Sequence, residues 1–305
     1  MFIFAPMNTK KLIVFILFAF LPMVAVGLMM HFSDASAMGL RAETSGIDPL
    51  AAVKGLLMSA GAMLIPLLAV IFTQLIFKEP VLKGFGISFK INRWWWIGWL
   101  LMPVISMAIL GVTLLMPGAN WTPDGEMVQQ SLQAMPEGTG VWVLIGITLL
   151  SGMIAGITIN ALFAFGEEIA WRGFLMKEFK GMKFLPAALC IGVIWGIWHT
   201  PLILNGHNYP QHPVAGVFAM VALCLLLTPM LMYFRKKGGS VIVAAIMHGT
   251  INAVAGVSAI VVTPANDLLY GATGAAGLFV LLVVDTCLYL YDKHISKENI
   301  FTSPL

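Results

Sequence analysis

The sequence contains little charge for its length. Of its 305 residues only 10% are Asp, Glu, Lys or Arg, whereas 59% belong to the apolar and aromatic set AVILMFWYC. A soluble domain carries about 25% charged residues, because charged side chains cover much of its surface. The composition therefore excludes a soluble protein, and the connections between the apolar runs are too short to hold a separate soluble domain.

Cysteine is scarce as well, and the basic residues are few. Cys190, Cys224 and Cys287 all lie inside apolar segments without CxxC spacing, which argues against a disulfide framework or a structural zinc site. Lys and Arg form short clusters between apolar runs, not the continuous basic face that nucleic-acid binding requires. Internal repeats and low-complexity tracts are also absent. We therefore treat residues 1–305 as one membrane domain.

Apolar runs of about 20 residues recur along the chain, and this is the length that crosses a hydrocarbon core of about 30 Å. The fold class we predict is all-α: a polytopic integral membrane protein with about eight transmembrane helices. The expected spans are approximately residues 12–31, 51–77, 94–116, 144–178, 184–204, 214–234, 240–262 and 270–291.

Lys and Arg gather in every second connection and at both ends of the chain. The connections 117–140, 205–213 and 263–269 contain neither residue, and only the first loop is mixed. By the positive-inside rule this alternation predicts an even number of spans with both termini in the cytoplasm. We expect the chain in the cytoplasmic (plasma) membrane of a bacterium.

The first span also resembles a signal peptide. Residues 10–37 have a basic start, an apolar stretch and the sequence Ala35-Ser36-Ala37, which is similar to a signal-peptidase site. Because the apolar stretch is longer than that of a usual signal peptide, we expect the segment to remain in the protein as a transmembrane helix.

The fourth predicted span contains three charged residues, each of which costs at least about 2.5–3.5 kcal/mol in a bilayer. Glu168 and Arg172 are four residues apart and are expected to pair on one helix face. Glu167 points about 100° away and is expected to have no local partner. A structural ion pair needs only one glutamate, so the second one suggests a function.

Two further spans contain polar residues at helical spacing. The fifth holds Trp195 and His199, and the seventh holds His248 and Asn252; each pair lies on one face of its helix. At about 1.5 Å per residue, Glu167, His199, His248 and Asn252 lie roughly 20, 24, 16 and 22 Å from the nearest basic cluster. We therefore predict a polar site buried between helices 4, 5 and 7.

This set of side chains suits hydrolysis of a peptide bond. A glutamate in a low-dielectric cavity is a suitable general base, and an imidazole beside it can help to activate water. A second imidazole and a carboxamide can donate hydrogen bonds to the oxyanion of a tetrahedral intermediate. Alternatively, Glu167, His199 and His248 could hold a zinc ion with an open position. The residues alone leave both mechanisms open.

At these positions the chain resembles the CPBP family of intramembrane proteases, also called the CAAX-protease and bacteriocin-processing or Abi family. The family patterns are EExxxR, FxxxH and HxxxN or HxxxD on three successive motif helices. They correspond here, in the expected order and within a core of residues 160–255, to Glu167-Glu168…Arg172, Trp195…His199 and His248…Asn252. Trp195 stands where the family usually has phenylalanine, which we interpret as a change in packing.

The resemblance implies a role for each of these residues. Glu167 activates water with His199, and His248 and Asn252 stabilise the oxyanion. Glu168 and Arg172 support the site or contact the substrate, although purely structural pairing is an equally good reading of these two. A mechanism that requires no cofactor is favoured, with zinc held by the glutamate and the two histidines as the alternative.

Other polar residues are left outside the predicted site. His207 and His212 lie in a connection rich in turn-forming residues, and we interpret them as solvated loop residues. Asp285 lies in the last span but belongs to no motif. It could hydrogen-bond a neighbouring helix or relay a proton.

The function we predict is that of an intramembrane endopeptidase whose partners are the lipid bilayer and a peptide or membrane-protein substrate, with no nucleic acid. A non-catalytic immunity or scaffold protein of the same fold is the alternative. A transporter that moves protons through Glu167, His199 and Asp285 is a third reading, but it should show paired repeats, which the sequence lacks. In a bacterium the candidate substrates are leader peptides, pheromones and membrane-protein fragments, not prenylated CAAX proteins.

Overall fold

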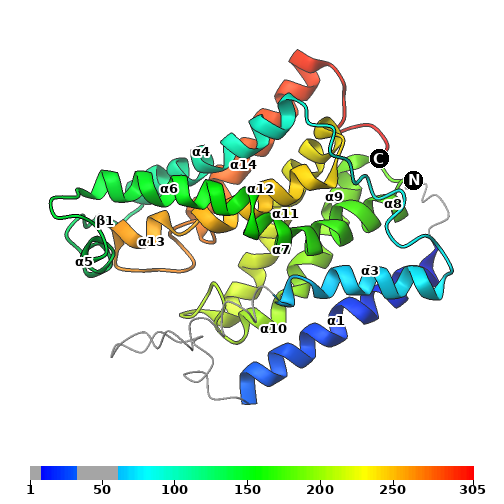
Figure 1. The fold of residues 1–305 in the computed structure, drawn as a ribbon, viewed down its shortest axis with the longest axis horizontal. Helices are drawn as coiled ribbons and strands as arrows, with labels where there is room; N and C mark the ends of the chain where they lie inside the picture. The colour runs from blue at the N-terminus through cyan, green and yellow to red at the C-terminus, as the bar shows by residue number, and fades with distance from the viewer. Residues whose placement is uncertain (1–7, 33–60) are drawn as a thin grey trace.

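The computed structural model describes residues 8–32 and 61–305, which fold almost entirely into helices (Figure 1). The only strands in the described part of the chain are β1 (Asn120–Trp121) and β2 (Val262–Thr263), which pair antiparallel with Asn120 opposite Thr263. The helices are α1 (Thr9–Phe32), α3 (Ile65–Ile76), α4 (Arg93–Leu115), α5 (Glu126–Gln133), α6 (Val141–Ile157), α7 (Ile159–Glu168), η1 (Ile169–Leu175), α8 (Met176–Glu178), α9 (Phe184–Trp198), α10 (Thr200–Ile203), α11 (Pro213–Gly238), α12 (Val241–Val254), α13 (Val257–Val261), α14 (Ala275–Leu290) and η2 (Tyr291–Ser296).

The length and apolar character of these helices confirm an all-α polytopic membrane protein. Six helical segments in the described residues are long and apolar enough to cross a membrane: Thr9–Phe32, Arg93–Leu115, Phe184–Ile203, Pro213–Gly238, Val241–Val261 and Ala275–Ser296. A seventh span is formed if Val141–Ile157 and Ile159–Glu178, which meet at a bend of 53°, count as one. The remaining predicted span, residues 51–77, lies partly outside the described residues. The sequence Ala35-Ser36-Ala37 lies entirely outside them.

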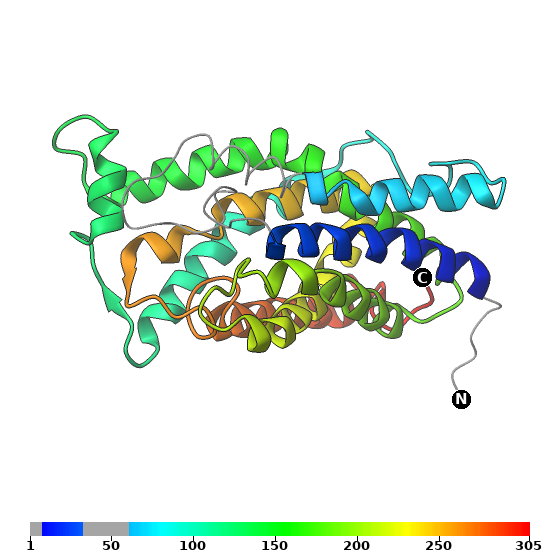
Figure 2. The same ribbon diagram turned by 90° about the horizontal axis from the view of Figure 1, so that it is seen from below.

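The helices lie side by side (Figure 2). Among the described residues, the connections with Lys and Arg that follow α3, α8 and α11 lie at one end. At this end, which we call the basic end, Lys11 of α1 pairs with Glu178 of α8, and Phe184 at the start of α9 donates its N–H to Ser303 O. At the opposite end Tyr270 donates its hydroxyl to Pro117 O. The two ends of the bundle therefore separate the basic connections from those without Lys or Arg, as the sequence predicts.

Capping residues fix where helices begin and end at the basic end. Asn92 Oδ1 accepts a hydrogen bond from the N–H of Trp94 at 2.9 Å, and Ser240 Oγ accepts one from Ile242 at 3.2 Å, so α4 and α12 each begin behind an N-cap side chain. Gly239 ends α11 at φ +68°, a left-handed conformation that a residue with a Cβ adopts only with strain.

Two glycines next to the motif residues allow the helices to approach closely. A Cβ at Gly249, beside His248, would lie 2.6 Å from the backbone nitrogen of Ala161 on α7. A Cβ at Gly196, beside Trp195, would lie 2.6 Å from Val221 Cα on α11. Because small residues let membrane helices pack backbone to backbone, these glycines bring α12 onto α7 and α9 onto α11.

Helix α1 is held against the bundle by a buried cation. Lys11 is only 2% exposed, and its Nζ lies 2.7 Å from both Glu79 Oε2 and Glu178 Oε1. The hydrogen bond from Lys11 lowers the pKa of Glu79, which lies in the connection after α3. Farther along α1, Ala19 O accepts a hydrogen bond from the indole of Trp198 at 3.0 Å. The first predicted span is thus joined to both α8 and α9.

Replacement of Lys11 by methionine should destabilise the protein by roughly 2–4 kcal/mol, because it leaves the buried Glu178 carboxylate without its cation while Glu79 is partly solvated. Thermal unfolding of the purified protein in detergent measures this effect. Lys10→Met is the matched control, because Lys10 is exposed and should leave the unfolding midpoint unchanged. Equal midpoints for both variants would show that the ion pairs do not stabilise the fold.

Candidate active site

The fourth predicted span changes its helical form where the charged motif begins. α7 ends at Glu168, and the following seven residues, Ile169–Leu175, form the π-helix η1, all of them buried. π-Helical turns are rare and occur frequently at functional sites. Arg172 lies on this segment, and its Nη1 donates to Glu168 Oε1 at 2.9 Å, with both side chains fully buried. The predicted ion pair is therefore confirmed.

Glu168 also binds the second motif histidine. Its Oε1 lies 2.9 Å from Nδ1 of His248 on α12, a residue that is 4% exposed. Because a carboxylate beside an arginine can only accept hydrogen bonds, Nδ1 of His248 carries the proton. The other ring nitrogen, Nε2, is then left for a substrate or water. A single carboxylate oxygen thus connects the fourth span to the seventh.

Arg172 continues this chain of hydrogen bonds to α11. Its Nη2 donates to Thr228 Oγ1 at 3.1 Å, and Thr228 donates in turn to Cys224 O at 2.7 Å. The guanidinium also lies over the ring of Trp195, 4.2 Å from its centroid. Sequence reasoning missed Thr228, since a single threonine in an apolar helix usually bonds only the carbonyl four residues back and gives no signal of a further partner.

Glu167 has two local partners, contrary to our expectation. Its Oε2 accepts hydrogen bonds from the indole N–H groups of Trp195 at 2.6 Å and Trp171 at 3.3 Å. The interpretation of Trp195 as a packing change is therefore incomplete, because the phenylalanine usual at this position has no N–H to donate. Oε1 of Glu167 accepts no hydrogen bond from the described residues, so one carboxylate oxygen is held and the other is available.

His199 lies at the C-terminal end of α9, half-buried beside the same tryptophan. Its Nδ1 lies 2.9 Å from Trp195 O, and since a carbonyl only accepts, Nδ1 carries the proton and Nε2 is an acceptor when the ring is neutral. The ring centroid of Trp195 lies 5.9 Å from that of His199 and 5.3 Å from that of His248. Trp195 thus forms a wall shared by both histidines.

The structure does not bring every predicted residue into this network. Asn252 lies one helical turn beyond His248 on α12, as its spacing predicts, but its side chain is exposed and forms no hydrogen bond with the described residues. Asp285 on α14 is half-buried, and its Oδ1 has no partner among them. Neither residue contributes to the hydrogen bonds around Glu167 and Glu168.

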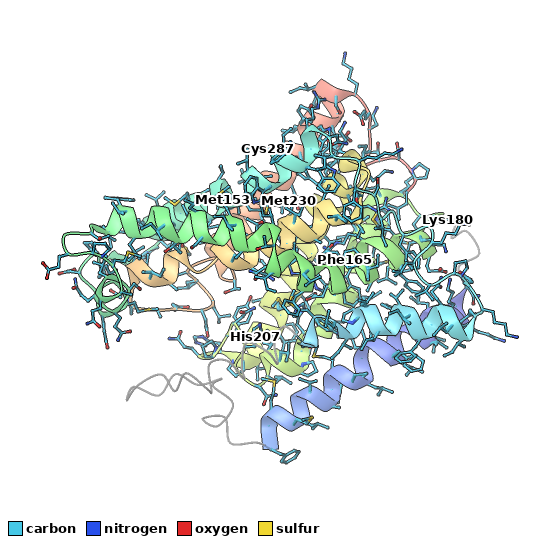
Figure 3. All side chains as sticks on the ribbon, in the orientation of Figure 1. Met153, Phe165, Lys180, His207, Met230 and Cys287 are labelled. Carbon is cyan, nitrogen blue, oxygen red and sulfur yellow. The ribbon has the colours of Figure 1, made fainter. Side chains whose placement is uncertain are left out.

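The connection after α10 lies closer to the site than expected. Tyr209 is fully buried, and its hydroxyl donates a hydrogen bond to Thr273 O at 2.8 Å. His212 is exposed, and its Nδ1 lies 2.6 Å from Asp267 Oδ1. His207 is half-buried near α10 (Figure 3), and this burial lowers its pKa to about 4, so it is uncharged at neutral pH. His207 therefore lies in the predicted connection, but it is half-buried and not fully solvated.

The alternative ligand set for zinc does not fit this arrangement. Among residues 8–32 and 61–305, no group of three His, Cys, Asp or Glu side chains lies close enough together to hold a metal ion. The two indole N–H groups bond Oε2 of Glu167 and leave the lone pairs of Oε1 free.

The motif residues lie in a segment of the chain that matches a known family. Residues 142–254 match the family described as type II CAAX prenyl endopeptidase Rce1-like, and the matched segment contains all of the motif residues. The chain is also 26% identical over 165 residues to a protein named CAAX prenyl protease 2 from Methanococcus maripaludis. That match covers 51% of this chain and 56% of the relative, so the chain spans about half the length of the curated relative it matches.

Replacement of Thr228 by valine should cost about 1–3 kcal/mol of stability, because it leaves a fully buried guanidinium N–H without its acceptor. Thr228→Ser, which retains the hydroxyl, should restore most of this loss. Thr73→Val is the matched control: Thr73 is equally buried and, among the described residues, bonds only the carbonyl of Ala69. Thermal unfolding in detergent measures the midpoint of each variant. Equal midpoints for the two valine variants would contradict a stabilising hydrogen bond from Arg172 to Thr228.

Proposed function

We propose that the chain is a member of the CPBP family of CAAX proteases, which its matches support, and an intramembrane endopeptidase that hydrolyses a peptide bond with water activated by Glu167. The observation that carries this proposal is the state of that carboxylate. Glu167 is 2% exposed, one of its oxygens is held by two indole N–H groups, and the other is free to accept a proton.

The reaction begins with a water molecule between Oε1 of Glu167 and Nε2 of His199. Glu167 takes a proton from the water while the water oxygen bonds to the carbonyl carbon of the substrate. The carbonyl oxygen then becomes an oxyanion. The indoles of Trp171 and Trp195 keep Oε2 in place, so Oε1 stays oriented toward the water. Glu167 then gives its proton to the amide nitrogen, the C–N bond breaks, and a carboxylic acid and an amine are released.

His248 is the proposed donor to the oxyanion. Its Nδ1–H is held by Glu168, so donation from Nε2 to the oxyanion requires a proton on both ring nitrogens. Arg172 shares the same carboxylate oxygen. Asn252 is exposed one turn farther along α12, a position from which its carboxamide would meet the substrate and not the other site residues.

A structural reading explains fewer of the contacts. Glu168 with Arg172 is sufficient as an ion pair to hold the fourth span, and this pair would serve a scaffold protein equally well. Glu167 adds a second buried carboxylate that no cation of residues 8–32 or 61–305 contacts, which is costly within a membrane unless it has a function. We propose a membrane-associated peptide or protein segment as the substrate, a cofactor-free mechanism, and a cytoplasmic location for both termini.

The Glu167→Gln variant should lose roughly 100-fold to 10,000-fold in kcat against fluorogenic peptides, because glutamine cannot accept the proton of water. The parent protein, this variant and His248→Ala are compared in detergent with and without a chelator. Glu137→Gln, which changes an exposed glutamate outside the site, is the control and should retain full activity. We expect cleavage by the parent to survive the chelator.

Each other result has a definite meaning. Loss of cleavage on chelation would contradict the cofactor-free mechanism. Equal cleavage by the parent and Glu167→Gln would contradict the proposed site. Cleavage by none of the proteins across a peptide library, including leader-peptide and membrane-segment sequences, would favour the scaffold reading.

The Trp195→Phe variant should lower kcat roughly tenfold with little change in KM, because it removes the donor of the shorter of the two hydrogen bonds that orient Glu167. Trp95→Phe is the matched control: its indole is also buried but donates to Gly238 O, away from the site. Steady-state kinetics on both variants measure the difference. An unchanged kcat for Trp195→Phe would assign this residue to packing alone.

A further inference from the structure

The connection after α10 holds a histidine that the proposed mechanism does not use. His199 joins α9 to α10, and His207 follows α10 after a short turn. His207 belongs to none of the three motifs. Its ring is half-buried and forms no hydrogen bond with residues 8–32 or 61–305. Both ring nitrogens are therefore available to a ligand.

The backbone turn after α10 fixes the place of His207. Gly206 has a φ of +91°, and its N–H donates to Ile203 O at 2.9 Å. The N–H of His207 donates to Leu202 O at 3.1 Å. These two bonds around a left-handed glycine form a Schellman motif, in which the residue after the glycine frequently packs an apolar side chain against the last helical turn. His207 occupies this position, so a polar ring lies where an apolar one is usual.

The neighbours of His207 are held on both sides. Asn205 Nδ2 donates to Pro201 O at 2.8 Å and to Gly27 O of α1 at 3.0 Å. Tyr209 is fully buried, and its N–H donates to His207 O at 2.8 Å. The connection is thus fixed before a ligand binds, which lowers the entropy that binding would cost.

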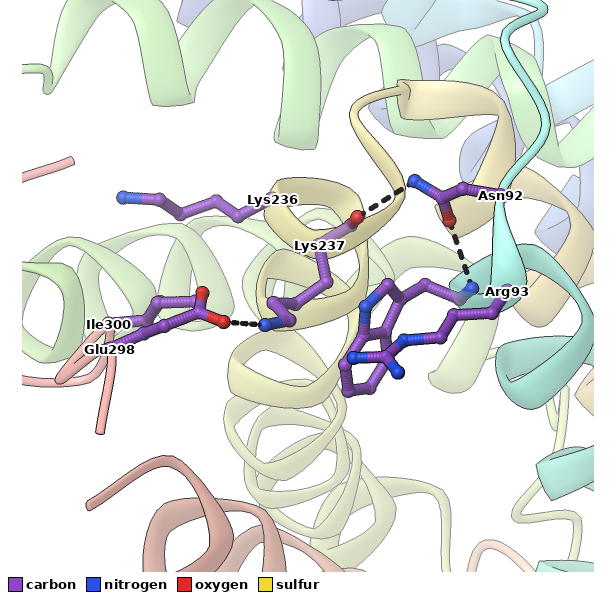
Figure 4. Close-up of a pocket in the computed structure, with 7 residues that line it drawn as sticks. Asn92, Arg93, Lys236, Lys237, Glu298 and Ile300 are labelled. Carbon is purple, nitrogen blue, oxygen red and sulfur yellow. Dashed lines mark hydrogen bonds and ion pairs between the residues drawn. The ribbon is translucent and has the colours of Figure 1, made fainter. Parts of the chain in front are cut away.

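The site residues become more exposed toward the end of the bundle where His207 lies, opposite the basic end. Glu168 is fully buried and Glu167 is 2% exposed, whereas His199 is half-buried and Asn252 is exposed. An open depression at the basic end is lined by residues of α4, α11 and the segment after η2, and by none of the motif residues (Figure 4). A substrate would therefore reach Glu167 from the end that carries His207.

The electrostatics agree with this placement. Burial lowers the pKa of His207 to about 4, and the His199 ring and the Glu167 carboxylate act on it as well. At neutral pH one ring nitrogen of His207 is then a hydrogen-bond donor and the other an acceptor. A neutral imidazole suits the uncharged amide groups of a peptide, whereas a phosphate or a carboxylate would call for a cation.

We propose that His207 binds the substrate by a hydrogen bond to the peptide backbone of a residue flanking the scissile bond, on the side that points away from the basic end. This inference rests on the proposed function, because it names a substrate contact of the same site. The contact does not involve the reacting atoms, so it has the same strength in the ground state and in the transition state. Its loss therefore raises KM and leaves kcat nearly unchanged.

The test measures peptide affinity of the full chain in the Glu167→Gln background, in which a bound peptide stays intact. The probes are fluorescein-labelled leader peptides and membrane segments, and fluorescence anisotropy in detergent follows their binding. His207→Phe, which keeps a ring where an apolar side chain is usual, should weaken binding of the tightest peptide roughly threefold to tenfold. His207→Gln, which keeps a donor and an acceptor, should restore most of the affinity. In the active protein, His207→Phe should raise KM by a similar factor.

His212→Gln is the matched control, because His212 lies in the same connection but is exposed and faces Asp267. It should retain the parent affinity, and thermal unfolding confirms that each variant is folded. Unchanged affinity in His207→Phe would overturn the proposal, and so would an equal loss in His212→Gln or the absence of binding by every peptide. If binding depends on His207 while the parent cleaves none of the peptides, the proposed proteolysis fails and the peptide contact is retained.

Discussion

The arrangement of the site depends on one buried carboxylate oxygen. Oε1 of Glu168 accepts from Arg172 on its own helix and from His248 on α12, with little or no exposure to solvent. In a membrane interior an unpaired charge is expensive, so each partner requires the other two to remain buried. Thr228 extends the constraint to α11. The charged motif therefore fixes three spans relative to one another before Glu167 takes any part in chemistry.

Glu167 is positioned by a different kind of group. Its partners are indole N–H donors, which can hold a carboxylate without carrying a full positive charge. A cation at the same distance would neutralise the proposed base, whereas an indole leaves it able to accept a proton. Trp195 serves both halves of the site, because its edge holds Glu167 while its face lies under the Arg172 guanidinium and beside both histidines.

The basic end of the bundle is joined to the site by α11. Lys11 holds α1 to α8 there, and Arg235, near the end of α11, donates to Arg172 O at 3.0 Å. One helix therefore contacts Arg172 through both the side chain of Thr228 and the side chain of Arg235.

The sequence alone determined the membrane class, most of the spans, the pairing of Glu168 with Arg172 and the three helices of the site, because hydropathy, charge alternation and helical spacing are local properties. It did not determine the indole donors to Glu167, the partner of His248, the exposure of Asn252 or the burial of His207. Those depend on how far each helix is rotated and how closely glycines such as Gly249 let it approach its neighbour. The tertiary structure decided them, because a hydrogen bond between spans requires two side chains to meet at one depth and one rotation, and no single helix specifies both.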